Sequence, residues 1–275
     1  MGLVDSIKKE AQDNRTKIQS SDATQLEKIL NATLYLDKNV EEETKFVKMV
    51  MTRGYENQER VGLHASSFIV GEKEFCLRAQ VLSLMYKQLQ GEQIPVGLKK
   101  IFEEGNAIHE KWQRLLIRAG YASANTLDVT QFNKQFRISF TPDIICKIPE
   151  FYDGKMVGEI KSVNTFQFQR MVKHPSASKQ LQWYMHLTGI HKGFVLCEDK
   201  NTQDTKLEVY DYDSMAVATF IERAEAIKYH YKRVHSEGKM VKRPSDAKSS
   251  DCKRCSKCVM RDACWNIGMG KVPIK

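Results

Sequence analysis

Residues 141–163 read TPDIICKIPEFYDGKMVGEIKSV and decide the fold. Two apolar runs, Asp143–Ile148 and Met156–Val163, are separated by Pro149 and the Asp153-Gly154 pair. Apolar runs of this length predict strands, and proline and Asp-Gly are typical of the connection between strands. The stretch therefore predicts a strand, a turn and a second strand.

Charged residues in this hairpin are spaced as a metal site requires. Glu159 and Lys161 are two residues apart in the second strand, so their side chains point to the same face. A loop centred near residue 152 would pair Asp143 with residues near Lys161, whereas a tight turn at Asp153-Gly154 would shift the register by several residues. Carboxylate oxygens suit Mg²⁺ or Mn²⁺, and a nearby lysine can orient water and stabilise charge on a phosphoryl group.

The rest of the chain predicts helices around this hairpin. A helix with one apolar stripe is expected from about Leu98 to Ala119; the stripe consists of Leu98, Ile101, Phe102, Gly105, Ile108, Trp112, Leu115 and Leu116, and it includes His109. Further helices are expected at 176–188 and 214–235, and further strands at 136–140, 193–197 and 206–210. This order predicts an α/β fold with a small mixed sheet flanked by helices.

The first 65 residues have helical periodicity without strong strand patterns, with apolar positions such as Leu26, Leu30 and Phe46. They are expected to form a helical extension, followed by one main domain over residues 66–275. Near the start of that domain, Cys76 and Arg78 are expected to begin a helix.

Composition narrows the functional classes. The formal net charge of +9 favours a polyanionic partner such as nucleic acid, although a solvated basic surface would have the same composition. No apolar run is long enough to span a membrane, and residues 1–10 lack the pattern of a secretory signal, so a cytoplasmic protein is expected. In a reducing compartment the seven cysteines favour metal binding over disulfides.

An Asp, a Glu and a Lys alone do not identify a site, because such a triplet is usually a set of weakly paired surface residues. The other motifs in the sequence are what make this triplet informative. Four motifs follow one another: GNAIH at 105–109, PD at 142–143, EIK at 159–161 and QLQWY at 180–184. Gln180 and Tyr184 are four residues apart on a predicted helix and face the same way. In this order the motifs resemble the RecB-type branch of the PD-(D/E)xK nuclease superfamily.

The resemblance covers about residues 66–265. It implies a Mg²⁺ or Mn²⁺ site whose ligands are His109, Asp143, Glu159 and the backbone carbonyl of Ile160. It also implies that Lys161 is the catalytic lysine, and that Gln180 and Tyr184 support the site and the DNA strand. The fold that it implies has a restriction-endonuclease-like core.

The cysteines near the C-terminus form a second mark of this family. Cys255, Cys258 and Cys264 have the spacing C-x2-C-x5-C, which resembles RecB-type nucleases with an iron–sulfur cluster, including CRISPR-associated RecB-like exonucleases and AddB-type nuclease domains. In that family a cysteine before the core completes the set, a position that Cys76 fits, although leucine follows it where the family often has proline. Spacing alone equally allows Cys252 as the fourth ligand.

Four thiolates suit a [4Fe–4S] cluster or, alternatively, tetrahedral Zn²⁺. A cluster here is expected to be structural, fastening the C-terminal segment to the helix near Cys76. Cys146 and Cys197 fall within predicted strands and are expected in the core.

Together these patterns predict a divalent-metal-dependent DNA exonuclease that acts on single-stranded or end-containing DNA, in recombination, repair, CRISPR adaptation or viral DNA processing. The chain has no Gly-x4-Gly-Lys-Ser/Thr sequence, so a helicase or a recombination partner would be a separate protein. The alternative is a catalytically silent DNA-binding or scaffolding protein that keeps the nuclease fold and a structural metal cluster.

Overall fold

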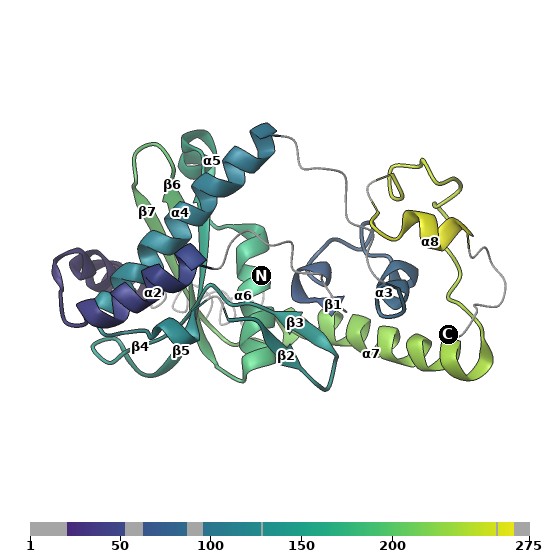
Figure 1. Cartoon of the computed structure of the whole chain (residues 1–275), viewed down its shortest axis with the longest axis horizontal. Coiled ribbons are helices and arrows are strands. Elements are labelled where there is room, and N and C mark those ends of the chain that lie inside the picture. The colour runs from purple at the N-terminus through teal and green to yellow at the C-terminus, as the bar shows by residue number, and fades with distance from the viewer. Residues whose placement is uncertain (1–20, 53–62, 87–95, 128, 257, 267–275) are drawn as a thin grey trace, which may run out of the picture. The chain divides into compact units, whose positions relative to one another are not determined.

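The computed structural model describes residues 21–52, 63–86, 96–127, 129–256 and 258–266. The chain forms two compact units that alternate along the sequence (Figure 1). The first unit contains Met1–Gly54, Gly97–Val129 and Thr141–Asp213, and the second contains Tyr55–Val96, Thr130–Phe140 and Ser214–Lys275. Parts of the predicted helical extension, residues 1–20 and 53–62, lie outside the described residues. The expected domain boundary at residue 65 stays a prediction.

The first unit is built on a mixed four-stranded sheet. Its strands are β4 (Ile144–Ile148), β5 (Tyr152–Val163), β6 (Lys192–Asp199) and β7 (Thr205–Asp211), in the order β4-β5-β6-β7. β5 pairs with β6 in parallel, and the two outer pairs are antiparallel. The mixed α/β core that the sequence predicts is confirmed.

The hairpin of β4 and β5 corrects one expectation. The connection consists of residues 149–151 alone, and Asp153 and Gly154 lie inside β5. The strands pair Ile144 with Gly158, so Asp143 lies beside Glu159 and Ile160, close to Lys161, as expected for a loop centred near residue 152 and not for a tight turn at Asp153-Gly154. The Asp-Gly pair suggested the wrong turn because the strand begins before it, at Tyr152.

Helices pack on the two faces of this sheet. One face carries α2 (Val40–Thr52), α4 (Val96–Arg118) and the helical residues 21–32; their apolar side chains join those of the sheet in one core cluster, which includes Leu26, Leu30, Phe46, Trp112, Leu116, Ile144, Cys146, Ile160, Phe194 and Leu196. The other face carries α6 (Pro175–Thr188), where a Cβ at Gly193 would lie 2.9 Å from Leu181. The expectation that Cys146 and Cys197 are core residues is confirmed, since both are buried.

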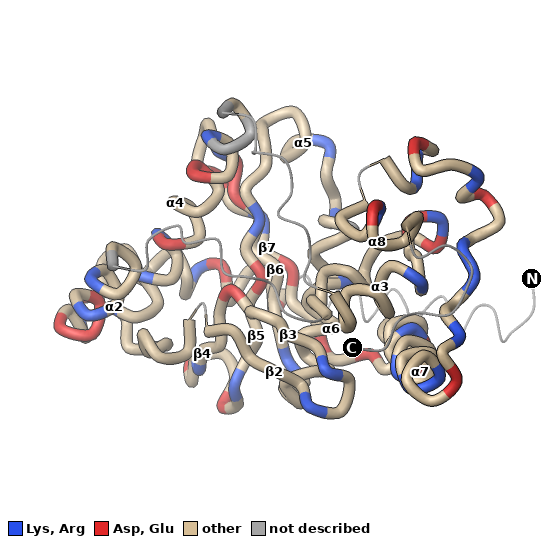
Figure 2. The backbone as a smooth tube through the Cα atoms, turned by 45° about the vertical axis from the view of Figure 1, so that its right-hand side comes forward, with Lys and Arg blue, Asp and Glu red and all other residues tan. Residues whose placement is uncertain are grey.

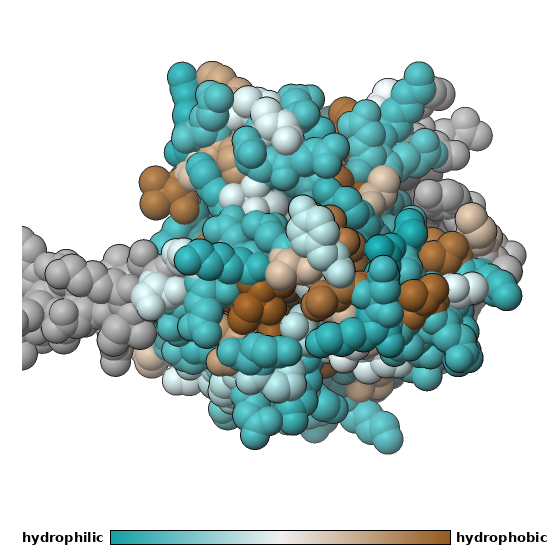
Figure 3. All heavy atoms as spheres, turned by 90° about the vertical axis from the view of Figure 1, so that its left-hand side faces the viewer, coloured by the Kyte–Doolittle hydropathy of each residue, from teal (hydrophilic) through white to brown (hydrophobic). Residues whose placement is uncertain are grey.

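The stripe predicted for α4 is correct only in its second half. Trp112, Leu115 and Leu116 are buried, but Ile101 and Phe102 are 53% and 50% exposed. Helical spacing indicates which side of a helix a residue faces, but not how far along the helix the core extends. Exposed hydrophobic residues also occur on the face drawn in Figure 3, where they lie among mostly hydrophilic residues.

An ion-pair network joins α2 to α4. Glu43 accepts hydrogen bonds from Arg118 Nε at 2.8 Å and from Arg114 Nε at 3.0 Å. The bond from Arg118 contributes most to holding the pKa of the Glu43 carboxyl below its usual 4.5, against a smaller opposing effect of burial. The side chain of Glu43 is only 9% exposed, so water screens the network little on that side.

Replacing Glu43 with glutamine is therefore expected to lower the free energy of unfolding by about 1–2 kcal/mol at pH 7. Because the folded-state pKa is lowered, this contribution is present above pH 4.5 and is lost as the pH falls through the folded-state value. Urea titrations at pH 7 and below pH 4 should show the difference and then its loss. Glu41→Gln, at an exposed position of the same helix, is the control, and equal stability of wild type and E43Q at pH 7 would contradict the prediction.

In its described residues the second unit has its own small sheet and three α-helices. The sheet, in the order β1-β3-β2, consists of β1 (Leu63–His64), β2 (Gln131–Asn133) and β3 (Ile138–Phe140). The helices are α3 (Leu77–Ser83), α7 (Ser214–Glu237) and α8 (Arg261–Asn266), and α3 packs on the other two. Phe136, expected in a strand, lies in the turn before β3.

Basic residues of this unit are concentrated on α7 and in the segment that follows it, as Figure 2 shows. Among the helices that the structure describes, none has the length and apolar character to cross a membrane. Three 3₁₀ helices complete the described elements: η1 (Thr33–Tyr35), η2 (Ala65–Ser67) and η3 (Ala124–Thr126).

Candidate active site

The candidate site lies in the first unit, where Asp143 immediately precedes β4. Its Oδ2 accepts a hydrogen bond of 2.8 Å from the backbone N–H of Ile160, on the neighbouring strand. Its backbone carbonyl accepts a second bond, also 2.8 Å, from Nε2 of the fully buried Gln113 on α4. Both the main chain and the carboxylate of Asp143 are thus held in place.

His109 approaches the same carboxylate from α4. Its Nδ1 lies 3.5 Å from Asp143 Oδ1. One turn earlier in the helix, a Cβ at Gly105 would lie 3.4 Å from Ser162 Oγ, so a small residue allows α4 to approach β5 closely. Burial lowers the pKa of His109, but the Asp143 carboxylate outweighs burial and raises the pKa overall. The His109 imidazole and the Asp143 carboxylate therefore interact electrostatically.

Glu159 and Lys161 point to the sheet face opposite the core cluster, as their spacing predicts. Glu159 is completely buried, and its Oε1 accepts a hydrogen bond from Lys161 Nζ. Burial, with the nearby Asp143 carboxylate, raises the pKa of Glu159 well above that of an exposed glutamate. Burial lowers the pKa of Lys161, but Glu159 and Asp143 outweigh it and raise the pKa overall, so the lysine stays charged.

The second oxygen of Glu159, Oε2, is buried and has no hydrogen-bond partner among the described residues. A carboxylate oxygen kept from water without a partner is costly, and a catalytic role or a bound ion is one explanation of such an atom. This atom is the clearest indication that the site takes a ligand.

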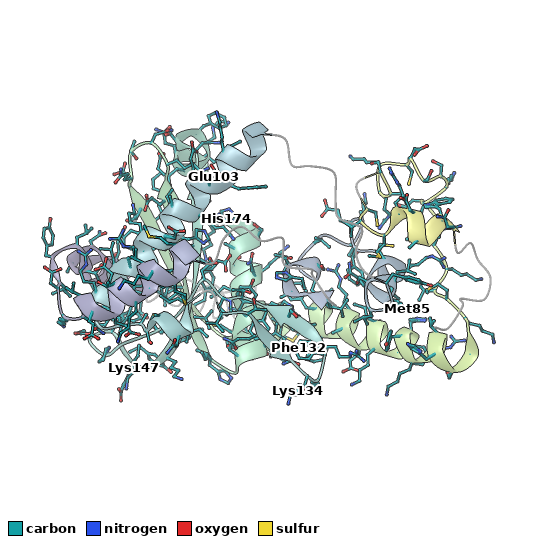
Figure 4. All side chains as sticks on the ribbon, viewed as in Figure 1. Met85, Glu103, Phe132, Lys134, Lys147 and His174 are labelled. Carbon is teal, nitrogen blue, oxygen red and sulfur yellow. The ribbon has the colours of Figure 1, made fainter. Side chains whose placement is uncertain are left out.

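The helix α6 supplies the fourth motif. Lys161 Nζ lies 3.5 Å from Gln180 Oε1, and Gln180 Nε2 donates a 3.0 Å bond to the Tyr184 hydroxyl. His174, labelled in Figure 4, caps the start of this helix by accepting a hydrogen bond from the N–H of Ala177. Burial lowers the pKa of His174, and the charge of Lys161 lowers it further, so the two side chains are in electrostatic range.

All the residues expected at the metal site are thus brought together in one network. The same structure reveals Gln113, which the sequence reading missed. Gln113 follows His109 by four residues, so helical spacing places it on the same side of α4, and this spacing was the available clue.

The cysteines expected at a second site lie in the second unit. Cys76 precedes α3, and Cys264 is in α8. Burial raises the pKa of Cys258, and Cys76 and Cys264 raise it further, so these three thiols are neighbours. Cys255 interacts with both Cys252 and Cys258, and burial together with Cys252 raises its pKa to about 11. Cys76 thus interacts with Cys258, and Cys252 with Cys255, so these interactions select neither Cys76 nor Cys252 as the fourth ligand.

A buried arginine joins α3 to this cysteine segment. Arg78 is 1% exposed, and its Nε donates to Cys264 Sγ at 3.1 Å. Its other nitrogens donate to the carbonyls of Val241 and Cys264.

Across the described residues, no three or more His, Cys, Asp or Glu side chains are grouped closely enough to hold a metal ion as they stand.

Comparisons with known proteins give a likeness in fold. No family model and no curated protein matches the chain. Among solved structures it is similar to the alkaline exonuclease LHK-Exo from Laribacter hongkongensis, with TM-score 0.43 and 14% identity over 63% of this chain and 89% of that one. It is also similar to LHK-Exo in complex with dAMP, with TM-score 0.46 and 14% identity over 62% and 88%.

A phage-related exonuclease from Haemophilus somnus 129PT gives TM-score 0.41 and 15% identity over 67% of this chain and 99% of that one. At these values the likeness assigns no activity.

Proposed function

We propose that the chain is a divalent-metal-dependent deoxyribonuclease of the RecB-like PD-(D/E)xK type, acting as an exonuclease on single-stranded or end-containing DNA. The observation that carries the proposal is the network around Glu159: a buried carboxylate with one oxygen bonded to Lys161 and the other without a partner. Asp143 and His109 join this network from other segments of the chain.

The donor set fits a hard divalent cation. Asp143 and Glu159 offer carboxylate oxygens, the Ile160 carbonyl and the His109 imidazole are the further ligands that we propose, and Mg²⁺ or Mn²⁺ prefers such donors. A metal ion at this position would satisfy the orphaned Glu159 oxygen and would relieve the repulsion between the two carboxylates. When bound, such an ion polarises the phosphoryl group and lowers the pKa of water.

The remaining side chains act on the substrate. Lys161, held between Glu159 and Gln180, presents a fixed positive charge that stabilises the negative charge growing on the phosphate. Gln180 limits the rotation of the lysine, and Tyr184 in turn holds the Gln180 amide. The protein thus supplies a preorganised cation and two oriented carboxylates, which metal-dependent phosphodiester hydrolysis can use.

A cleavage assay tests the proposal directly. The full chain would be incubated with end-labelled single- and double-stranded DNA in Mg²⁺, in Mn²⁺ and in EDTA. Metal-dependent release of nucleotides from the ends is expected. DNA binding without cleavage in either metal would instead favour the silent, scaffolding alternative.

Gln180→Ala is expected to lower kcat roughly tenfold with little change in KM, because the substitution frees Lys161 without removing its charge. Tyr184→Phe, which removes only the hydroxyl that holds Gln180, should have a smaller effect. Steady-state kinetics on a labelled oligonucleotide separate the two parameters. A change confined to KM would show that Gln180 contacts DNA and does not position the lysine.

We also propose a [4Fe–4S] cluster on Cys76, Cys255, Cys258 and Cys264, with Zn²⁺ as the alternative metal and Cys252 as the alternative ligand. The chemistry of the thiol group fits either metal, and Arg78 supplies a hydrogen-bond donor of the kind that orients a ligating sulfur. The cluster would be structural, because it would fasten the end of the chain to α3. A cytoplasmic setting and a separate helicase or recombination partner remain part of this proposal.

A further inference from the structure

The short helix α5 (Thr165–Arg170), which follows the catalytic strand, is fastened firmly to the sheet. Phe168 is 8% exposed, and Lys206 of β7 lies over its ring, with Nζ 4.5 Å from the centroid. The same ammonium donates to the carbonyls of Phe168 and Met171. The sheet thus holds the carbonyls at the end of α5 through Lys206.

The beginning of α5 is fastened as well. The Thr165 hydroxyl donates to Asp199 Oδ1 at 3.0 Å and accepts from Asn201 Nδ2 at 2.8 Å. Asn164 caps the helix by accepting from the N–H of Gln167 at 2.9 Å. With both ends tied down, the side chains on the outer side of α5 are presented on a rigid support.

An aromatic ring and positive charges occupy that outer side. Phe166 is 62% exposed, and the guanidinium of Arg170 lies 3.9 Å from its ring centroid. Val172, next along the chain, is 88% exposed, and the exposed Lys173 follows it. A rigid aromatic face with adjacent cations is how proteins hold unpaired bases and their phosphates.

The segment that carries Phe166 and Arg170 lies next to the candidate site. α5 begins two residues after Val163, the last residue of the strand that carries Glu159 and Lys161. Asp199, which anchors Thr165, is paired with Val163 across the sheet. At the other end of the segment, His174 caps α6, the helix that carries Gln180, by accepting a hydrogen bond from the N–H of Ala177. The segment therefore borders the site at both its ends.

We propose that Phe166, with Arg170 beside it, stacks on an unpaired base of the DNA strand next to the scissile phosphate, and so makes the enzyme prefer single-stranded ends. The inference rests on the proposed nuclease function. A paired base cannot offer its face to Phe166, because its neighbours in the duplex cover it. A strand without bases would lose the contact entirely.

Binding of two strands of equal length tests the inference, one of oligodeoxythymidylate and one of abasic DNA. Fluorescence anisotropy would be measured on the full chain with Ca²⁺ in place of the catalytic metal. Phe166→Ala is expected to weaken binding of oligodeoxythymidylate roughly tenfold and to leave binding of the abasic strand unchanged. Phe166→Trp should keep the tighter binding.

Tyr35→Ala is the matched control, since Tyr35 is an exposed aromatic residue of the same unit on η1 and should not matter. The inference is overturned if F166A binds both strands as wild type does, or loses affinity for both equally. If only the stacking inference fails, wild type still cleaves DNA. If the proposed nuclease function fails, wild type does not cleave DNA at all.

Discussion

Asp143→Asn is expected to lower metal-dependent DNA cleavage by at least about 10²-fold while the protein stays folded. Asparagine has the same size and keeps an oxygen that can accept the hydrogen bond from the Ile160 N–H. It removes the negative charge that a divalent cation needs beside Glu159. The variant therefore separates the charge of residue 143 from its structural role.

The stability of this variant should be equal to or greater than that of wild type at pH 8. Burial first, and then the Asp143 carboxylate, raise the pKa of Glu159, so ionising Glu159 costs folding stability as the pH rises above the usual glutamate range. Removing the Asp143 charge reduces that cost. In acid, where Glu159 is protonated in both proteins, the gain should vanish.

Asp153→Asn provides the matched control, because Asp153 is a 94% exposed carboxylate of the same hairpin, paired only with the half-exposed Lys147. It should cleave as wild type does. Rates come from single-turnover cleavage of a labelled oligonucleotide, and stability from thermal denaturation of the metal-free proteins. Wild-type cleavage by D143N would show that the site assignment is wrong.

Cys264→Ser is expected to remove the bound cofactor and to lower the free energy of unfolding by about 2 kcal/mol or more. Cys264 is 9% exposed, lies in a small core cluster with Leu82 and Met260, and accepts a hydrogen bond from Arg78. Loss of a ligand there would release the C-terminal segment from α3. Broad visible absorption and bound iron should disappear together.

Two further cysteine variants complete this experiment. Cys197→Ala, in the core of the other unit, should leave the metal content unchanged. Comparing Cys76→Ser with Cys252→Ser identifies the fourth ligand, since only one of them should lose the cofactor. Anaerobically purified wild type that is colourless and holds zinc would exclude the iron–sulfur cluster, and wild type without any metal would exclude both cofactors.

The sequence selected the residues of the candidate site more readily than it placed them in register. Asp143, Glu159 and Lys161 could be selected because few residue types bind a hard cation and stabilise a phosphate. Their register depended on a turn whose position Asp153-Gly154 indicated wrongly. Gln113 was harder to find, because a glutamine in a helix usually has only a structural role.

The second unit was also beyond the sequence. Strands of two or three residues, such as β1 and β2, carry too little periodicity to be recognised. The division into two units was hidden because each unit is assembled from separate stretches of chain. Nothing in a local pattern states which distant segments will pack together.

The hydrogen bond from Ile160 to Asp143 has a consequence for how such a site can vary. The donor is the main-chain N–H, which every amino acid except proline supplies, and the side chain of residue 160 is buried on the opposite face of the sheet. Evolutionary drift at this position is therefore limited by the volume of the core and not by catalysis. The middle residue of a Glu-x-Lys motif can change from one apolar type to another while the aspartate on the neighbouring strand keeps its orientation.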